Sequence, residues 1–291
     1  MNQFKYISPK KKEEVLKILK QEKSKACIVA GCSNVLPYIK DRKLPAKLLL
    51  DISDIKELNY ISKKEGKIYI GPTTTISDLI NSKIIREECN LLYQTAEEFA
   101  DPIVRNRATI GGNLADASPA ADMAPPLLVL DAILEAESID KKREISLKEF
   151  FIAPRKTVLR EDEMISSIKI KNSFLNKNGC FIKLGLRQAM AISVATMAMV
   201  LEVEKNKVKN VRIAMGSIAP IPLRLLKTEE FLINKEVNDD LIEKAIAKVR
   251  EEVNPIGDVR ASAEYRRYVS GILFKRAFNK LTEKRIHRFT N

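Results

Sequence analysis

Residues 109–126 read TIGGNLADASPAADMAPP and differ in composition from the rest of the chain. They consist mostly of glycine, alanine, serine and proline, and their only charged residues are Asp116 and Asp122, although 31% of all 291 residues are charged. A long loop with so few charged side chains gains little from facing water. The composition therefore predicts a loop that is buried against another part of the protein.

The first five residues of this stretch include the paired glycines Gly111 and Gly112. Glycine adopts backbone angles closed to other residues, and two in succession leave a cleft free of side chains. Thr109 and Asn113 flank the pair with hydrogen-bonding groups, and Asp122 can accept bonds from ribose or ribityl hydroxyls. This chemistry indicates a site for a nucleotide.

A second glycine-containing loop, AGCSNV at residues 30–35, follows an apolar run at 26–30 and precedes an expected helix at 35–40. Backbone N–H groups converge at such a strand-to-helix turn, and a phosphate can sit against them. By itself the loop also fits a plain turn, but a pyrophosphate needs several converging donors, which the two loops supply together. Neither GxGxxG nor GxxxxGK followed by Ser or Thr occurs, which argues against a Rossmann site or a P-loop.

Hydrophobic periodicity predicts alternating strands and helices outside the two loops. Ser8 and Pro9 indicate the capped start of an amphipathic helix, and the polar segment 172–179 indicates a domain linker. Strands followed by helices beyond the linker are typical of an α+β domain with helices on one face of an antiparallel sheet. The predicted strands are 47–52, 67–71, 132–136, 164–170, 181–186, 193–204 and 208–215, and the predicted C-terminal helices are 228–232, 239–253 and 263–281.

The overall composition narrows the classes of function. The chain carries 51 Lys and Arg against 38 Asp and Glu, a formal charge of +13. The basic residues form short runs between acidic ones without interleaved aromatics, which favours a solvated surface or an acidic partner subunit over nucleic acid. No apolar stretch of about 18 residues and no signal-peptide core occur, so we expect a cytoplasmic protein that does not enter a membrane.

Histidine and cysteine are too few or too scattered for several kinds of site. The single histidine, His287, lies four residues from the end, which argues against a Ser-His-Asp triad, a histidine-rich metal centre or a flavin attached through histidine in the body of the chain. Cys27, Cys32, Cys89 and Cys180 form no CxxC pair, which disfavours a zinc or Fe–S site built from this chain alone. We expect four reduced thiols.

The two loops resemble those of the FAD-binding medium subunit of the molybdenum hydroxylases, the family of xanthine dehydrogenases and aerobic CO dehydrogenase. Residues 109–132 follow the family pattern T-I-G-G-N-x-A-x-A-S-P-A-x-D almost position by position. Residues 27–36, CIVAGCSNVL, resemble its strand followed by A-G-G, then Ser or Thr, then Asp or Asn. The resemblance continues through 181–193 (FIKLGLRQAMAIS), 216–224 (GSIAPIPLR) and 261–265 (ASAEY), and so spans nearly the whole chain.

The resemblance implies a fold and a non-covalent FAD. Residues 1–173 would form an α+β FAD-binding domain of the vanillyl-alcohol-oxidase type, with subdomains at about 1–53 and 54–173. A smaller α+β domain would follow at 178–291. The residues implied to hold the FAD pyrophosphate are Ile28, Val29, Ala30, Gly31, Cys32, Ser33, Asn34, Val35, Thr109, Ile110, Gly111, Gly112 and Asn113.

Four further residues carry implied contacts with FAD. Asp122 would bind a sugar-chain hydroxyl, Phe99 would lie beside the flavin ring, and Ile165 and Lys183 would contact the flavin more loosely. On the residues alone, Phe99 and Ile165 also fit the core, and Lys183 fits the surface. Cys32 stands where the family has a second glycine, which puts unusual backbone angles at that position in doubt.

The implied function is that of an oxidoreductase subunit, with no catalytic or metal-binding side chain of its own. FAD would receive electrons from a molybdopterin-bearing large subunit through the 2Fe–2S clusters of a small subunit, and pass them to NAD or another acceptor. The run Ala189-Met190-Ala191-Ile192 after Arg187 resembles the purine-oxidising branch, so xanthine or a similar purine is the expected substrate of the holoenzyme. A CO, aldehyde or N-heterocycle dehydrogenase is the alternative.

Two other classes of protein compete with this interpretation. The string Gly31-Cys32-Ser33-Asn34 resembles the G-S-N loop of the NADPH-dependent peptidoglycan-precursor reductase, but the rest of that family's pattern is not recognisable here. A non-enzymatic basic binding protein would leave both loops as ordinary turns. The Cys-rich insertion of the branch that reduces aromatic CoA esters is missing, which sets that branch aside.

Overall fold

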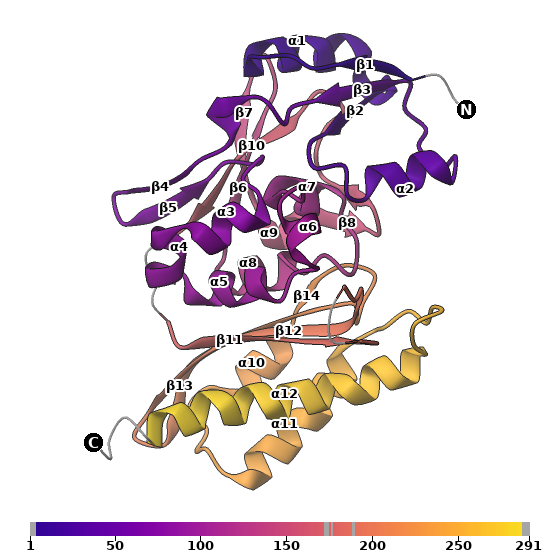
Figure 1. Ribbon diagram of the computed structural model, residues 1–291. Helices are drawn as coiled ribbons and strands as arrows, with labels where there is room; N and C mark the ends of the chain where they lie inside the picture. The colour runs from indigo at the N-terminus through magenta and orange to yellow at the C-terminus, as the bar shows by residue number, and fades with distance from the viewer. Residues whose placement is uncertain (1–3, 172–174, 176, 188–189, 287–291) are drawn as a thin grey trace.

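The computed structural model describes residues 4–171, 175, 177–187 and 190–286. Sheets of three, five and four strands follow one another along the chain, together with a two-stranded hairpin. Figure 1 shows the sheets arranged from one end of the molecule to the other, with helices packed between them. Positions 172–174 and 176 of the predicted linker lie outside the described residues, as does His287.

The N-terminal sheet is parallel, with strand order β1 (Lys5–Ile7), β3 (Leu48–Asp51) and β2 (Ala26–Val29). Helix α1 (Lys12–Glu22) connects β1 to β2, and α2 (Val35–Lys40) follows β2. The predicted start of α1 at Ser8 and Pro9 is wrong, because the helix begins at Lys12 without a side-chain cap from its own N-cap residue. Glu57 replaces such a cap by accepting a bond from the Lys12 N–H at 3.0 Å.

The central sheet is antiparallel and packs with a layer of short helices. Its order is β4 (Ile61–Lys64), β5 (Lys67–Ile70), β10 (Met164–Ile170), β6 (Ile133–Glu137) and β7 (Lys142–Ser146). The helices and this sheet share one hydrophobic core. The helices are α3 (Ile76–Asn81), α4 (Lys83–Glu88), α5 (Asn90–Glu97), α6 (Pro102–Arg105), α7 (Ile110–Ala115), α8 (Ala124–Val129) and α9 (Leu147–Phe150), and the hairpin consists of β8 (Phe151–Ala153) and β9 (Lys156–Thr157).

Most of the stretch 109–126 is buried, as predicted, although Gly112 and Ala115 are exposed, and it is not a single loop. It contains α7 and the start of α8, and all six residues of α8 are buried. Thr109 caps α7 by accepting a bond from the Gly112 N–H at 3.1 Å. Pro125 and Pro126 lie in the first turn of α8, where no N–H is needed. Proline and glycine here mark helix starts instead of irregular structure.

The C-terminal sheet is antiparallel, with strand order β11 (Gly179–Gly185), β12 (Ser193–Glu204), β13 (Lys207–Gly216) and β14 (Leu223–Arg224). Figure 1 shows α10 (Leu226–Leu232), α11 (Asp239–Glu252) and α12 (Ala263–Ile286) on one face of this sheet. The prediction of an α+β domain with helices on one face of an antiparallel sheet is confirmed. No helix in the described part of the chain is both long and apolar enough to cross a membrane.

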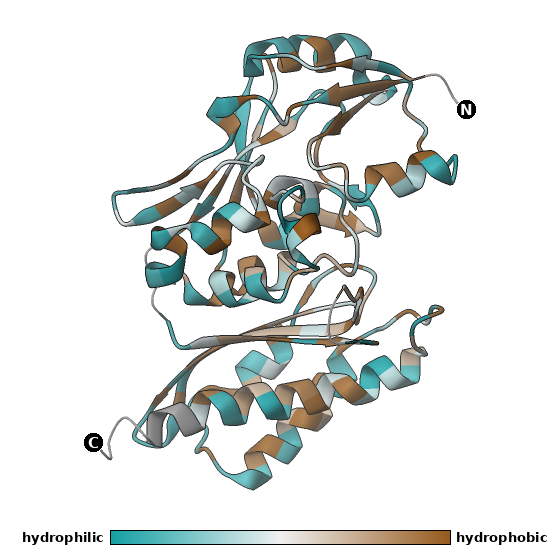
Figure 2. Cartoon of the chain, viewed as in Figure 1, coloured by the Kyte–Doolittle hydropathy of each residue, from teal (hydrophilic) through white to brown (hydrophobic). Residues whose placement is uncertain are grey.

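Strand β12 is buried on both faces, and its side chains alternate between two cores. Met197 and Met199 belong to the core shared with α10–α12, whereas Ala198 and Val200 belong to the core of the central helices. Alternation of this kind follows from the two-residue period of a strand. Figure 2 shows the strands of this sheet mostly in the hydrophobic colours. The C-terminal domain is therefore packed directly on the part of the chain that contains the central sheet, through α5 and α8.

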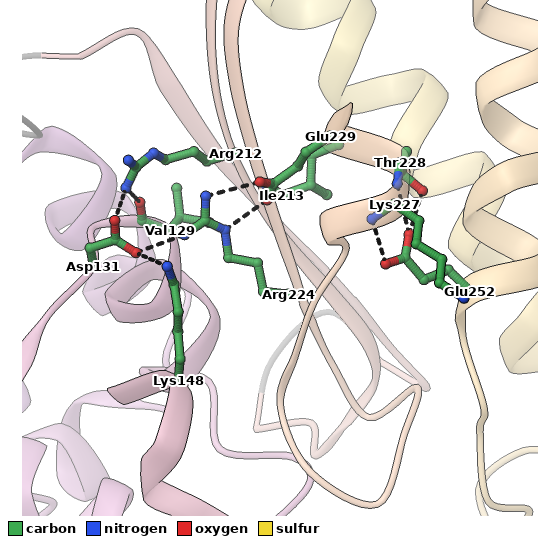
Figure 3. A network of polar contacts seen from close by, with 10 residues as sticks. All are labelled: Val129, Asp131, Lys148, Arg212, Ile213, Arg224, Lys227, Thr228, Glu229 and Glu252. Carbon is green, nitrogen blue, oxygen red and sulfur yellow. Dashed lines mark hydrogen bonds and ion pairs between the residues drawn. The ribbon is translucent and has the colours of Figure 1, made fainter. Parts of the chain in front are cut away.

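A network of charged residues joins the two halves beside α8 (Figure 3). Asp131 accepts bonds from Lys148 Nζ at 3.0 Å, from Arg224 Nη1 at 2.7 Å and from Arg212. Arg224 also forms a bidentate pair with Glu229, at 2.7 and 2.9 Å. Burial opposes ionisation of Asp131, but the hydrogen bond from Lys148 and the charges of the two arginines outweigh it and lower the pKa of this carboxyl.

Candidate functional site

A cavity of about 1160 Å³ opens where the N-terminal sheet, the central helices and the C-terminal sheet meet. Pockets for small molecules commonly measure roughly 300–1,000 Å³, so this cavity has room for a large cofactor. One predicted site residue, Ile110, does not line it and is fully buried in the core. The predicted residues that line the cavity are Ile28–Val35, Phe99, Thr109, Gly111–Asn113, Asp122, Ile165 and Lys183.

The loop between β2 and α2 presents a run of unused hydrogen-bond donors to the cavity. Within the part of the chain that the structure describes, the backbone N–H groups of Gly31, Cys32, Ser33 and Asn34 donate to no protein acceptor. Cys32 has a φ of 57°, in the left-handed region. A left-handed residue in such a turn makes successive N–H groups converge into an anion-binding concavity. The unusual backbone angle that the cysteine put in doubt is therefore present: Cys32 adopts the left-handed conformation although it replaces a glycine.

Gly31 brings this loop against the segment that precedes α7. A Cβ atom at Gly31 would lie 1.8 Å from the carbonyl oxygen of Arg107 and 3.0 Å from the nitrogen of Ala108. No side chain fits in that space, so the glycine is required by the close approach of two backbones. The contact places the first loop directly beside the second.

The second loop contributes a wall without side chains, not free backbone donors. Gly111 and Gly112 lie in α7, and neither has a positive φ, so the expectation of unusual backbone angles is wrong for this pair. Their N–H groups already donate to the Pro72 carbonyl at 3.0 Å and to the Thr109 hydroxyl at 3.1 Å. Gly111 is packed against Pro72, whereas a Cβ at Gly112 would meet only the Thr109 hydroxyl.

Asp122 lies between two side chains of the C-terminal sheet. Lys183 Nζ donates to its Oδ2 at 2.6 Å, and the Ser193 hydroxyl donates to its Oδ1 at 2.5 Å. The side chains of Lys183 and Asp122 are only 8% and 10% exposed, so the interpretation of Lys183 as a surface residue is wrong. Burial raises the pKa of Asp122, while the charge of Lys183 and both hydrogen bonds act in the opposite direction.

Phe99 and Ile165 fit both of the interpretations that the sequence left open. Both belong to the hydrophobic core of the central helices and sheet, and both line the cavity. Phe99 follows α5, and Ile165 lies on β10 beside a register shift. They form an apolar part of the cavity wall, suited to an aromatic ring system.

A polar cluster that the sequence did not reveal spans the cavity beside the first loop. Asp116 accepts a bond from Asn34 Nδ2 at 2.9 Å and another from Arg155 Nη1 at 2.9 Å. The Arg155 guanidinium lies 4.2 Å from the centre of the Tyr38 ring. Because the cluster ties α2 to the β8–β9 hairpin, it holds the N-terminal sheet in place over the cavity.

A second group of polar residues lines the other end of the cavity, and the sequence did not predict it. Arg266 Nη1 donates to the carbonyls of Val194 at 2.6 Å and Ser217 at 3.0 Å, and Nη2 donates to Asp258 Oδ1 at 2.6 Å. Burial acts against the charge of Asp258, but bonds from the Arg260 backbone and from Arg266 lower the pKa of this carboxyl to about 2. The ASAEY motif precedes Arg266, but its sequence gave no signal for these partners.

Two family descriptions match adjacent parts of the chain. Residues 2–171 match the FAD binding domain in molybdopterin dehydrogenase, and residues 181–281 match the CO dehydrogenase flavoprotein C-terminal domain. The chain belongs to the FAD-binding medium subunits of the molybdenum hydroxylases. FAD is accordingly the cofactor of its N-terminal domain, as the resemblance implied.

Individual medium subunits resemble the chain over most of its length. The glyceraldehyde dehydrogenase medium chain of Sulfolobus acidocaldarius is 29% identical over 279 residues, covering 96% of this chain and 98% of that protein. The xanthine dehydrogenase FAD-binding subunit of Escherichia coli O157:H7 is 29% identical over 256 residues, covering 87% and 88%. A carbon monoxide dehydrogenase structure from Hydrogenophaga pseudoflava superposes with a TM-score of 0.91 at 30% identity, covering 95% and 96%.

Proposed function

We propose that this medium subunit holds FAD in the cavity with the pyrophosphate against the loop between β2 and α2. The observation that carries the proposal is the run of unused N–H groups from Gly31 to Asn34, curved by the positive φ of Cys32. A pyrophosphate oxygen accepts several such bonds at once, and these four residues are half-buried or exposed, so their N–H groups are accessible to a ligand in the cavity. The bare face of Gly112 lets the phosphates approach from the other side.

The remaining residues of the proposed site orient the cofactor and exclude water. Asp122 would accept a bond from a sugar-chain hydroxyl, while Phe99 and Ile165 would pack against the flavin ring and Lys183 would contact it more loosely. When bound, FAD supplies the capacity to take up an electron pair and release it to an acceptor. No side chain of this chain needs to act as an acid, base or nucleophile, which fits the absence of histidine from residues 1–286.

We further propose that the chain works in a complex with a molybdopterin-bearing large subunit and a small subunit with 2Fe–2S clusters. Its similarity over nearly full length to proteins called medium chain or FAD-binding subunit supports this. Electrons would enter from the small subunit and leave to NAD or another acceptor.

The proposed domain boundaries are 1–173, with subdomains at about 1–53 and 54–173, and 178–291.

For the holoenzyme we propose a purine such as xanthine as substrate. The support is the resemblance of residues 189–192 to the purine-oxidising branch. Of this run, Met190, Ala191 and Ile192 line the cavity, and Ala189 lies outside the described residues. The similarity to a glyceraldehyde dehydrogenase medium chain favours an aldehyde as the competing substrate. Oxidation of an aldehyde but of no purine by the assembled complex would end the purine proposal.

A comparison of FAD with FMN tests the proposed pyrophosphate site. FMN carries the flavin ring and ribityl chain but lacks the pyrophosphate and adenosine. If the N–H groups of Gly31–Asn34 hold the pyrophosphate, the full-length chain should bind FAD at least about tenfold more tightly than FMN, since each bond to a charged group contributes about 1.5–3 kcal/mol. Equal affinities in a calorimetric titration would contradict the proposed position of the pyrophosphate.

A further inference from the structure

Ser193 begins β12 and contacts the proposed FAD site through Asp122. It is 2% exposed and lines the cavity, and its hydroxyl donates to Asp122 Oδ1 at 2.5 Å. Lys183 lies on the paired strand β11, and its ammonium group donates to the other carboxylate oxygen of Asp122. Asp122 belongs to the FAD-binding half of the chain, so both of these partners reach it from the C-terminal domain.

The backbone around Ser193 is itself held in place. Arg266 donates to the carbonyl of Val194, the next residue along β12, at 2.6 Å. The same guanidinium is fixed by Asp258 and by the carbonyl of Ser217. The Lys183 ammonium lies 3.3 Å from the Glu98 carbonyl. These bonds leave Ser193 and Lys183 little freedom to follow Asp122 if its carboxylate turned.

The carboxylate retains capacity for a ligand after both contacts. An ionised carboxylate has about four lone-pair positions, and the two protein donors use two of them. The remaining positions can accept bonds from the hydroxyls of a ligand in the cavity. Among the described residues, Lys183 is the one charged side chain that pairs with Asp122. This ion pair contacts a single carboxylate oxygen, and without the Ser193 hydroxyl the carboxylate could rotate about that contact.

We propose that Ser193 is a positioning residue of the FAD site, whose hydroxyl fixes the rotation of the Asp122 carboxylate. This rests on the proposed function, in which Asp122 accepts a bond from a sugar-chain hydroxyl of FAD. The C-terminal domain thereby takes part in cofactor binding through a residue that does not itself need to touch FAD. A purely structural serine would stabilise the domain interface without affecting the affinity for FAD.

Isosteric substitutions separate these roles in the full-length chain. Ser193→Thr keeps the hydroxyl, whereas Ser193→Val replaces it with a methyl group. Threonine and valine have the same shape, so both substitutions add nearly the same volume at this position. We expect the Thr variant to bind FAD like the original chain. The Val variant should bind it about tenfold more weakly, because a misplaced Asp122 carboxylate would lose its bond to the sugar-chain hydroxyl, one bond to a charged group. Ser270→Ala is the matched control, because Ser270 is fully buried in α12 and does not line the cavity.

The pH profile gives a readout that a structural role would not change. Without the Ser193 hydroxyl, Asp122 loses a bond that lowers its pKa, so it becomes protonated at a higher pH. Release of bound FAD, followed by its fluorescence as the pH falls from about 7 to about 4, should begin at a higher pH in the Val variant than in the Thr variant.

Three outcomes would overturn the inference. The Val and Thr variants could bind FAD equally, the Ser270→Ala control could weaken binding as much as the Val variant, or the two release profiles could coincide. Thermal unfolding of each variant identifies any that does not fold. If the Val variant does not fold, the Thr variant still tests the proposal, because a tenfold loss of FAD affinity with the hydroxyl retained would also refute the positioning role of Ser193. Failure of the original chain to bind FAD would instead refute the proposed function.

Discussion

A Cβ atom added to Gly31 would lie 1.8 Å from the carbonyl oxygen of Arg107. The two residues are far apart in sequence, and this contact sets the first loop of the cavity against the segment that leads into α7. The atoms that this Cβ would meet belong to the backbone, so no side-chain rotation can relieve the clash. The position of the unused N–H groups from Gly31 to Asn34 therefore depends on the absence of a side chain at residue 31.

Gly31→Ala should displace the first loop and weaken FAD binding by at least about tenfold, since overpacking a closed contact typically costs about 1–3 kcal/mol. The matched control is Gly257→Ala, whose Cβ would come no closer than 3.4 Å to any neighbour. Its FAD affinity should match that of the original chain. Fluorescence titration of both variants makes the comparison, and equal affinities would show that the loop does not depend on this contact.

Cys32 holds a left-handed backbone conformation that costs a non-glycine residue about 1–2 kcal/mol. Cys32→Gly should relieve this strain and bind FAD as tightly as the original chain or more so. Cys32→Val should bind more weakly, because β-branched residues avoid positive φ. Cys32→Ala separates the thiol from the backbone effect and should behave like the original chain. Equal FAD affinity of the Val and Gly variants would contradict the role of this φ.

Arg224 links Asp131 and Glu229 at the junction of the two halves and is 9% exposed. Arg224→Met should lower the free energy of unfolding by about 3–5 kcal/mol, because it leaves the buried Glu229 carboxylate without its arginine partner. Lys244→Met, which removes an exposed pair with Asp240, should change it by at most about 1 kcal/mol. Urea denaturation of both variants measures the difference, and similar losses would mean that the network in Figure 3 contributes little.

Acid stability should depend on Asp258, whose pKa of about 2 in the folded protein lies below the value of about 3.9 for an unperturbed aspartate. A lowered pKa stabilises the folded state above about pH 4, and this contribution is lost as the pH falls toward about 2. Asp258→Asn should therefore be less stable at neutral pH and lose less stability over that interval. Thermal unfolding across this pH range checks the sign, and parallel curves for both proteins would refute it.

Long strands with mostly buried residues were predictable from the sequence. The predictions of 164–170 and 193–204 coincide with β10 and β12, which are buried along most of their length. Strands β4 and β7 were not predicted. Both lie at the edges of the central sheet, and their sequences ISKK and KREIS carry charged residues that suit an exposed edge. Hydrophobic periodicity cannot distinguish such strands from loops.

The two cavity loops were predictable because each is a short local motif. The partners of Asp122 and Asp116 were not, since Ser193 and Arg155 lie 71 and 39 residues away along the chain. For Lys183 the sequence offered either the surface or a loose contact with the flavin, and the ion pair with Asp122 became visible only once β11 was placed against the central helices. Contacts of this length depend on tertiary packing and leave no local pattern.

The visible spectrum of the purified full-length chain, recorded after incubation with FAD and removal of unbound flavin, is the first measurement to make for FAD binding. We expect flavin bands at about 375 and 450 nm, from a cofactor that acid releases without protease and that is identified as intact FAD. At a limiting FAD concentration, Gly31→Ala should retain much less flavin than Gly257→Ala. A colourless protein that takes up no FAD, alone or with its partner subunits, would show that the cavity is not an FAD site.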